Sequence, residues 1–174
     1  MKGFGDQPKS KQKSNKKSKP SKEQIINKAF KFHSEGNISE AVKYYQYFIN
    51  QGFKDHRIFS NYGVILKNLG KFQEAELLQR KAIEIKPDFA NAHSNLGSIL
   101  RNLGNLQEAE FSYHKAIELN PDFADAHFNL GAIFRDLGNL KKAKLSTRKA
   151  IDLDPEDANA HYNLGTILVD LGNF

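Results

Sequence analysis

NLGSILRNLGN, at residues 95–105, recurs along the chain at intervals of thirty-four residues. The related stretches are NYGVILKNLGK at 61–71, NLGAIFRDLGN at 129–139 and NLGTILVDLGN from Asn163 onward. A fixed period between about 20 and 50 residues is typical of a solenoid, in which similar units stack on one another. The chain therefore divides into the units 22–55, 56–89, 90–123 and 124–157, followed by a partial unit, 158–174.

The pattern within each unit predicts two helices. In the third unit, apolar residues at helical spacing predict a first helix over 92–103, closed by Gly104, which can adopt the left-handed conformation. A second helix is expected over about 106–119, because Pro121 cannot continue it. Asp122 is then expected to cap the helix that follows.

Small residues stand where the two helices of a unit must approach each other. In the third unit they are Gly97 in the first helix and Ala109 and Ala116 in the second. The corresponding residues of the neighbouring units are Gly63, Ala75, Ala82, Gly131, Ala143 and Ala150. Because a glycine inside a helix costs about 1 kcal/mol relative to alanine, we expect it to allow close packing of the two backbones.

These residues resemble the signature of the tetratricopeptide-repeat family. The matching residues of the third unit are His93, Leu96, Gly97, Leu100, Ala109, Tyr113, Ala116 and Pro121. The family's tryptophan is replaced by a bulky residue, which is His93, His127, His161 or Phe59. The first unit is looser, with Phe48 in place of a small residue and Phe53 in place of the proline.

The resemblance covers residues 22–174 and implies an all-α fold. The expected architecture is a right-handed α-solenoid of about four and a half helix–turn–helix repeats, whose first helices line a concave surface. The first unit, 22–55, would be a divergent repeat, and 158–174 would supply only the first helix of a fifth. For such a stack the family resemblance implies a scaffold that binds other proteins.

The positive charge of the chain lies in its first 21 residues. Seven lysines against one acid give this segment a net charge of +6, which equals that of the whole chain. Lysine- and serine-rich composition predicts a disordered tail over 1–21. The tail is interpreted as a solubilising leader, and the alternative is a basic arm for RNA, anionic lipid or an acidic partner. Nucleic-acid binding is disfavoured because no aromatic residues are interleaved to stack on bases.

Composition also limits the cellular compartments in which the protein is expected. The chain has no cysteine, no apolar run long enough to span a bilayer and no secretory signal at its N-terminus. We therefore expect a soluble, cytoplasmic protein. No cofactor, metal site or catalytic residues are predicted: the glycines follow helices rather than strands, and repeated histidines on successive hairpins lie too far apart to share a metal. The protein is accordingly predicted not to be an enzyme.

One asparagine recurs in the first helix of every unit. These residues form a predicted ladder: Asn27, Asn61, Asn95, Asn129 and Asn163. A carboxamide both donates and accepts hydrogen bonds, so the ladder is predicted to bind the backbone of an extended peptide. It resembles the asparagine ladder of O-linked N-acetylglucosamine transferase, whose repeats grip unfolded acceptor segments. The alternative interpretation is that the asparagines bond between neighbouring hairpins, since duplicated units repeat every residue.

A basic stripe accompanies the ladder. Lys67, Arg101 and Arg135 are predicted to attract acidic side chains of a ligand, although ordinary solvated charges would give the same pattern. The favoured function is a non-catalytic scaffold for protein or peptide partners. The alternative is the substrate-recognition arm of a larger or truncated enzyme, such as a glycosyltransferase.

The last helix supplies a further expectation. No capping helix follows the partial unit, so the apolar face of Leu164, Ile167 and Leu168 is expected to be partly bare. This predicts either a truncated piece of a longer protein or self-association through the C-terminal repeat.

Overall fold

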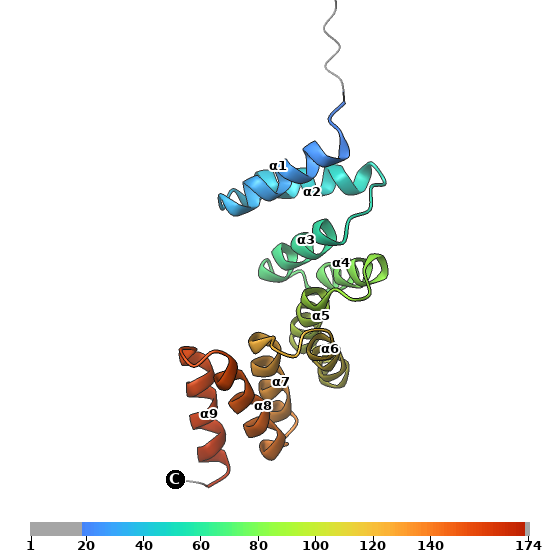
Figure 1. Ribbon diagram of the computed structural model, residues 1–174. Coiled ribbons are helices and arrows are strands. Elements are labelled where there is room, and N and C mark those ends of the chain that lie inside the picture. The colour runs from blue at the N-terminus through green and yellow to red at the C-terminus, as the bar shows by residue number, and fades with distance from the viewer. Residues whose placement is uncertain (1–18, 173–174) are drawn as a thin grey trace, which may run out of the picture.

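The computed structural model describes residues 19–172 and shows, within that range, nine α-helices and no strand (Figure 1). Residues 1–18 of the predicted tail lie outside the described residues. The helices are α1 (Lys22–Ser34), α2 (Ile38–Asn50), α3 (His56–Asn68), α4 (Phe72–Ile85), α5 (Ala90–Asn102), α6 (Leu106–Leu119), α7 (Ala124–Asp136), α8 (Leu140–Leu153) and α9 (Ala158–Asp170). The described part of the chain therefore has the predicted all-α architecture.

Consecutive helices pack in pairs, and each pair packs on the next. The hairpins α1–α2, α3–α4, α5–α6 and α7–α8 have the most extensive contacts, and the second helix of a hairpin then packs on the first helix of the following unit. The stack curves, so that α1 and α9 reach farther to the left than α4 and α6 in Figure 1. We call the surface formed by α1, α3, α5, α7 and α9 the inner face, and that formed by α2, α4, α6 and α8 the outer face.

The predicted helix ends are confirmed to within two residues, and α5 spans Ala90–Asn102 where 92–103 was predicted, but one predicted cap is wrong. Gly104 closes α5 at a φ of +81°, and α6 ends at Leu119, directly before an extended residue and Pro121. Asp122 was wrongly predicted to cap the next helix, because α7 begins at Ala124 and its N-cap residue is Phe123. The aromatic ring at this position packs into the core between two units. The helix begins at the same repeat position in α9, where the N-cap residue is Asp157, so the carboxylate of Asp122 stands one residue too early and lies within the preceding turn.

The glycines of α3, α5 and α7 lie at a close approach, as predicted, but the nearest atoms are side chains of the second helix and not its backbone. A Cβ atom placed on Gly97 would lie 2.9 Å from the ring of Tyr113, and one on Gly63 would lie 2.6 Å from Nε2 of Gln79. Gly131 meets Thr147 in the same way. The contacting residue is thus a large or polar side chain of the second helix, whereas the alanines next to it are fully buried.

The histidines at the family's tryptophan position tie each helix to the turn before it. Nε2 of His93 lies 2.9 Å from the carbonyl oxygen of Pro87. His127 and Pro121, and His161 and Pro155, make the same contact at the same distance. Because a carbonyl oxygen only accepts, Nε2 is the donor in each case. The three imidazoles therefore serve as hydrogen-bond donors; those of His93 and His127 are half-buried, whereas that of His161 is exposed.

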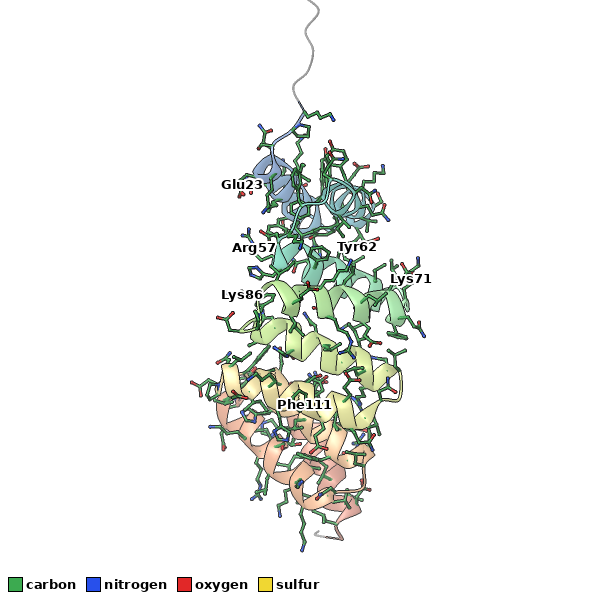
Figure 2. All side chains as sticks on the ribbon, turned by 90° about the vertical axis from the view of Figure 1, so that its right-hand side faces the viewer. Glu23, Arg57, Tyr62, Lys71, Lys86 and Phe111 are labelled. Atoms are coloured by element: carbon green, nitrogen blue, oxygen red, sulfur yellow. The ribbon has the colours of Figure 1, made fainter. Side chains whose placement is uncertain are left out.

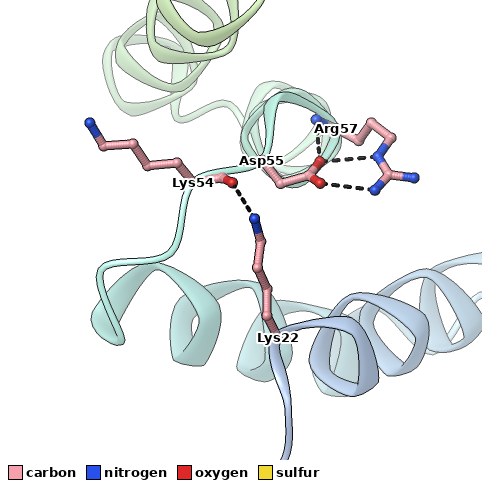
Figure 3. Close-up of polar contacts among 4 residues, drawn as sticks. All are labelled: Lys22, Lys54, Asp55 and Arg57. Atoms are coloured by element: carbon pink, nitrogen blue, oxygen red, sulfur yellow. Dashed lines mark hydrogen bonds and ion pairs between the residues drawn. The ribbon is translucent and has the colours of Figure 1, made fainter.

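The junction between the first two units is built differently. Its proline is replaced by Phe53, whose ring centroid lies 5.4 Å from that of the fully buried Phe48. Here Nζ of Lys22 donates to the carbonyl oxygen of Lys54 at 2.8 Å, and Asp55 accepts from Arg57 at the start of α3 (Figure 3). Helices α2 and α3 are also less closely packed than the corresponding pairs farther along the stack.

The last helix, α9, is better packed than its sequence predicts. Ile167 was expected to be partly bare but is fully buried, whereas Leu164 and Leu168 are half-buried. Its side chain joins the core cluster formed by α5, α6, α7 and α8. Among the described residues nothing lies within 4 Å of a Cβ placed on Gly165, unlike the corresponding glycines of the complete hairpins.

This difference predicts opposite effects of two identical substitutions. Gly97→Ala should lower the free energy of unfolding by about 1–2 kcal/mol, because overpacking against Tyr113 outweighs the gain in helix propensity. Gly165→Ala should raise it by up to about 1 kcal/mol, because only the gain in propensity remains. Urea denaturation followed by circular dichroism measures both. Equal effects of the two substitutions would contradict the packing described above.

The histidine contacts predict a specific cost for their loss. His127→Phe keeps a bulky ring but removes the donor to Pro121, and should cost about 1 kcal/mol of unfolding free energy. His114→Gln, at an exposed position without such a contact, is the control and should change stability by less than about 0.5 kcal/mol. The same denaturation measurement applies, and an unchanged midpoint for His127→Phe would show that the bond contributes nothing.

Candidate functional site

The predicted asparagine ladder follows the inner face of the stack. Asn27 lies in α1 and is exposed, whereas Asn61, Asn95 and Asn129 of the following first helices are half-buried. Asn163, in α9, is only 6 % exposed. The structure therefore places all five carboxamides at corresponding positions, and accessibility falls along the ladder toward α9.

Three of the ladder residues contact the preceding unit. Nδ2 of Asn95 donates to Oγ of Ser60 at 3.3 Å, and Nδ2 of Asn163 donates to Oγ1 of Thr147 at 3.4 Å. The side chain of Asn61 lies beside the hydroxyl group of Tyr45. These contacts correspond to the alternative interpretation of the ladder, in which carboxamides bond between hairpins. The half-buried members still leave part of the carboxamide exposed to solvent.

Asn129 behaves differently from the other half-buried members. Its Nδ2 donates to the carbonyl oxygen of Asp125, one turn earlier in the same helix, at 2.8 Å. This contact lies within α7, so the carboxamide oxygen keeps its full capacity to accept. The third and fourth units, although nearly identical in this region of sequence, thus engage their asparagines in different ways.

The basic stripe is largely engaged within the inner face. Nε of Arg101 lies 2.8 Å from Oδ2 of Asp136, which belongs to the next unit. Nη1 of Arg135 donates to Oδ1 of Asn163 and to Oγ1 of Thr166, both at 2.9 Å. Lys67 is half-buried. The two arginines therefore connect successive first helices, a role that their spacing in the sequence did not indicate.

A layer of polar side chains lies directly behind the first helices. It consists of Tyr45, Gln79, Tyr113 and Thr147, all fully buried and contributed by the second helices. Nε2 of Gln79 donates to the carbonyl oxygen of Ser60 at 2.9 Å. Among the described residues, Oε1 of Gln79 and the hydroxyl of Tyr113 have no hydrogen-bond partner. Sequence reasoning missed this layer, whose only signal is a polar residue amid helical apolar spacing.

The two buried tyrosines remain protonated at neutral pH. Burial raises the pKa of Tyr45 to about 12, against the opposing effect of the neighbouring Asn61, and its hydroxyl lies 2.8 Å from Nδ1 of His33. Burial also raises the pKa of Tyr113 well above its ordinary value. Both hydroxyls are therefore neutral, and that of Tyr45 lies beside the ladder residue Asn61.

The outer face carries a regular row of exposed apolar side chains. Leu77 of α4, Phe111 of α6 and Leu145 of α8 recur every thirty-four residues and are 63 %, 71 % and 67 % exposed. Figure 2 looks onto the side of the molecule on which α4 and α6 lie and labels Phe111, the middle member of the row. The row is absent from the first unit, where Lys43 takes the position.

A groove of about 690 Å³ separates α2 from α4 on the outer face. Gln46 and Ile49 of α2 face Leu77 and Lys81 of α4 across it, and Tyr62 of α3 contributes to its lining. No residue of the predicted ladder or basic stripe lines this groove. It coincides with the loosely packed junction at which the bulky Phe48 stands in place of a small residue.

The described residues hold no arrangement typical of a metal centre, because no three histidine or acidic side chains within 19–172 gather closely enough. In the same range no helix has both the length and the apolar character needed to cross a membrane.

Comparison with known proteins identifies the repeats. Models of the tetratricopeptide repeat match residues 56–89, 90–123, 112–144 and 131–172. A comparison with curated proteins gives no match. MamA 41-end from Desulfovibrio magneticus RS-1 has a similar structure, with a TM-score of 0.78 and 24% identity over 87% of this chain and 86% of that one.

Two further solved structures share the fold. YrrB, described as a TPR protein with an unusual peptide-binding site, has a TM-score of 0.73 and 24% identity over 82% of this chain and 73% of its own. The first TPR of Spaghetti (RPAP3), bound to the HSP90 peptide SRMEEVD, has a TM-score of 0.66 and 24% identity over 67% of this chain and 93% of that one.

The helical pairs, the buried glycines and alanines, and the order of the hairpins agree with these comparisons. The four family matches together run without a gap from residue 56 to residue 172. The chain belongs to the tetratricopeptide-repeat family.

Proposed function

We propose that this chain is a protein-interaction scaffold whose inner face binds an extended segment of a partner protein. The observation that carries the proposal is the row of accessible carboxamides, Asn27, Asn61, Asn95 and Asn129, one on each successive first helix. A carboxamide can pair with both the N–H and the C=O of a peptide unit. A row of such groups suits recognition of backbone rather than of one particular side-chain sequence.

The spacing of the row fits an extended ligand. Packed helices lie about 8–10 Å apart, and an extended chain advances about 3.3–3.6 Å per residue. One carboxamide would therefore meet every third residue of the bound segment. Two structural neighbours, RPAP3 with its HSP90 peptide and YrrB with its peptide-binding site, show that this fold can hold a peptide.

The basic stripe would have a secondary part in this function. Because Arg101 is paired with Asp136 and Arg135 is bonded to Asn163 and Thr166, neither guanidinium is free to attract a ligand without breaking a contact between units. Lys67 is the member of the stripe best placed to contact an acidic ligand side chain. The ligand therefore gains little from a high negative charge, and binding should depend only weakly on salt.

The alternative function remains a prediction from the sequence. Under it, the same inner face would deliver acceptor segments to a larger enzyme, as in O-linked N-acetylglucosamine transferase, which the asparagine ladder resembles. Both functions require an extended peptide on the inner face, and they differ in what the full-length protein does next. The size of the endogenous protein distinguishes them.

Asn163 should act on stability and not on binding. Asn163→Ala removes the acceptor of Arg135 and the donor to Thr147 at a buried site, which should cost about 1–3 kcal/mol of unfolding free energy. Urea denaturation measures the loss. Asn27→Ala, in which the carboxamide is exposed, is the matched control and should change stability by less than about 0.5 kcal/mol.

Asn95 and Asn129 should act on binding without unfolding the chain, although Asn95→Ala also removes the hydrogen bond to Ser60. The probe is a set of fluorescein-labelled fifteen-residue peptides without helical propensity, and fluorescence anisotropy first identifies those that bind the full chain. Replacing both asparagines by alanine should then weaken binding about thirtyfold, because two lost hydrogen bonds of about 1 kcal/mol each amount to about 2 kcal/mol. Circular dichroism should show unchanged helicity.

The control for this experiment is Asn105→Ala, at the turn before α6, where the side chain makes no capping bond. It should leave the affinity within about twofold, as expected for an exposed residue away from the binding surface. An affinity unaffected by the double substitution would exclude the ladder as the binding site and would favour its role in joining hairpins.

A further inference from the structure

The outer face of α8 differs sharply in charge from the corresponding faces of its neighbours. The helix carries five basic residues, Lys141, Lys142, Lys144, Arg148 and Lys149, and a single acid, Asp152. At two positions where α4 and α6 have glutamates, α8 has lysines. Lys142 corresponds to Glu74 of α4 and Glu108 of α6. Lys144 corresponds to Glu76 of α4 and Glu110 of α6.

An exposed leucine lies at the centre of these charges. Leu145 is 67 % exposed, and four exposed basic residues stand three or four positions before or after it. Side chains at these spacings are neighbours on a helix surface, about 5–6 Å apart. They are Lys141, Lys142, Arg148 and Lys149. We call Leu145 and these four residues the α8 patch.

The cations of the α8 patch are not neutralised within the protein. Among the described residues, none of them forms an ion pair with an acid; Nζ of Lys142 lies 5.0 Å from the centroid of the Phe134 ring. The neighbouring outer helices differ in this respect. Arg80 pairs with Glu76 and Glu108, and Lys115 pairs with Glu118.

The charge pattern of α8 opposes the stability of the helix itself. Acidic residues are favourable in the first turn because they complement the helix dipole, and Glu40, Glu74 and Glu108 occupy that position in α2, α4 and α6. In α8 the position is Lys142. Lys144 and Arg148, four residues apart, also repel each other. A local conflict of this kind indicates that the charges serve something outside the helix.

We propose that the α8 patch binds an acidic segment of a partner protein in which carboxylates flank an apolar side chain. The carboxylates would pair with the four cations, and the apolar side chain would cover Leu145. From Lys141 to Lys149 the patch extends about 12 Å along the helix, the length of a short peptide motif. The central leucine favours a protein ligand over a nucleic acid, because phosphates would gain no binding energy from contact with an apolar side chain.

This surface is independent of the inner face. It lies on a second helix, whereas the asparagine ladder lies on first helices, so one chain could hold two segments at once. Binding at the α8 patch should weaken strongly as salt is added, because exposed charges are screened within about 10 Å at 0.1 M ionic strength. That dependence distinguishes it from the peptide binding proposed for the inner face.

The test uses the full chain and two fluorescein-labelled peptides. One has four glutamates on each side of two leucines, and the other has serines in place of the leucines. The variant Lys141→Glu with Lys142→Glu reverses two cations of the α8 patch in the first turn of α8, where α6 carries Glu108. It should weaken anisotropy-detected binding of the leucine peptide about tenfold or more, while the melting temperature rises or stays unchanged. Loss of binding then cannot be ascribed to unfolding.

Two controls complete the design. Lys81→Glu with Lys115→Glu makes the same change in net charge on α4 and α6, and should leave the affinity within about twofold. Leu145→Ser should weaken binding of the leucine peptide severalfold and leave binding of the serine peptide unchanged.

Several results would overturn the proposal. They are failure of the leucine peptide to bind the full chain, equal losses in the α8 variant and in the Lys81 and Lys115 control, and no effect of Leu145→Ser. A single-stranded oligouridine that binds more tightly than the peptide, through the same lysines but without Leu145, would instead assign the patch to nucleic acid.

Discussion

The three complete hairpins α3–α4, α5–α6 and α7–α8 each depend on one missing side chain, that of the glycine in their first helix. Where Gly131 stands, Thr147 of the second helix approaches so closely that a Cβ atom would collide with it. The same threonine then accepts a hydrogen bond from Asn163 of the following unit. One buried residue therefore sets both the distance within a hairpin and the contact between hairpins. Tyr45, beside Asn61, occupies the corresponding place at the first junction.

The two faces of the stack differ in how their charged side chains are paired. On the inner face, Arg101 and Arg135 find partners in the next unit, so polar groups there hold the first helices in register. On the outer face, α4 and α6 form ion pairs, whereas the four cations around Leu145 of α8 have no acidic partner among residues 19–172. The formal neutrality of residues 22–174 thus conceals a local excess of positive charge that only comparison of equivalent helices reveals.

Much of the fold could be predicted from the sequence because the same signals for helix ends and close packing recur in several repeats. The glycine at the close approach, the left-handed Gly104 and the boundary at Pro121 were predicted and confirmed. Asp122 was misplaced by one residue: the N-cap position of this repeat is that of Phe123, which is occupied by an aspartate in α3 and α9. Burial of Ile167 depends on contacts with helices distant in sequence.

The site was less predictable than the fold. The sequence places all five asparagines at the same position of the repeat. It cannot show that Asn163 is buried while Asn27 is exposed, because the exposure of each side chain depends on how neighbouring hairpins pack. The partners of Arg101 and Arg135 lie about one repeat away, beyond any local pattern. Whether the exposed carboxamides meet a ligand stays a prediction.

The bond between a histidine and the proline carbonyl before it has a mechanical consequence. It fastens a helix to the preceding turn at three successive junctions, through His93, His127 and His161. The first junction has Phe59 and Phe53 instead, and lacks this fastening. When a force acts on both ends of the stack, for example from a long bound ligand, the units from α3 onward should move as one rigid body. Bending should then occur at the junction between α2 and α3.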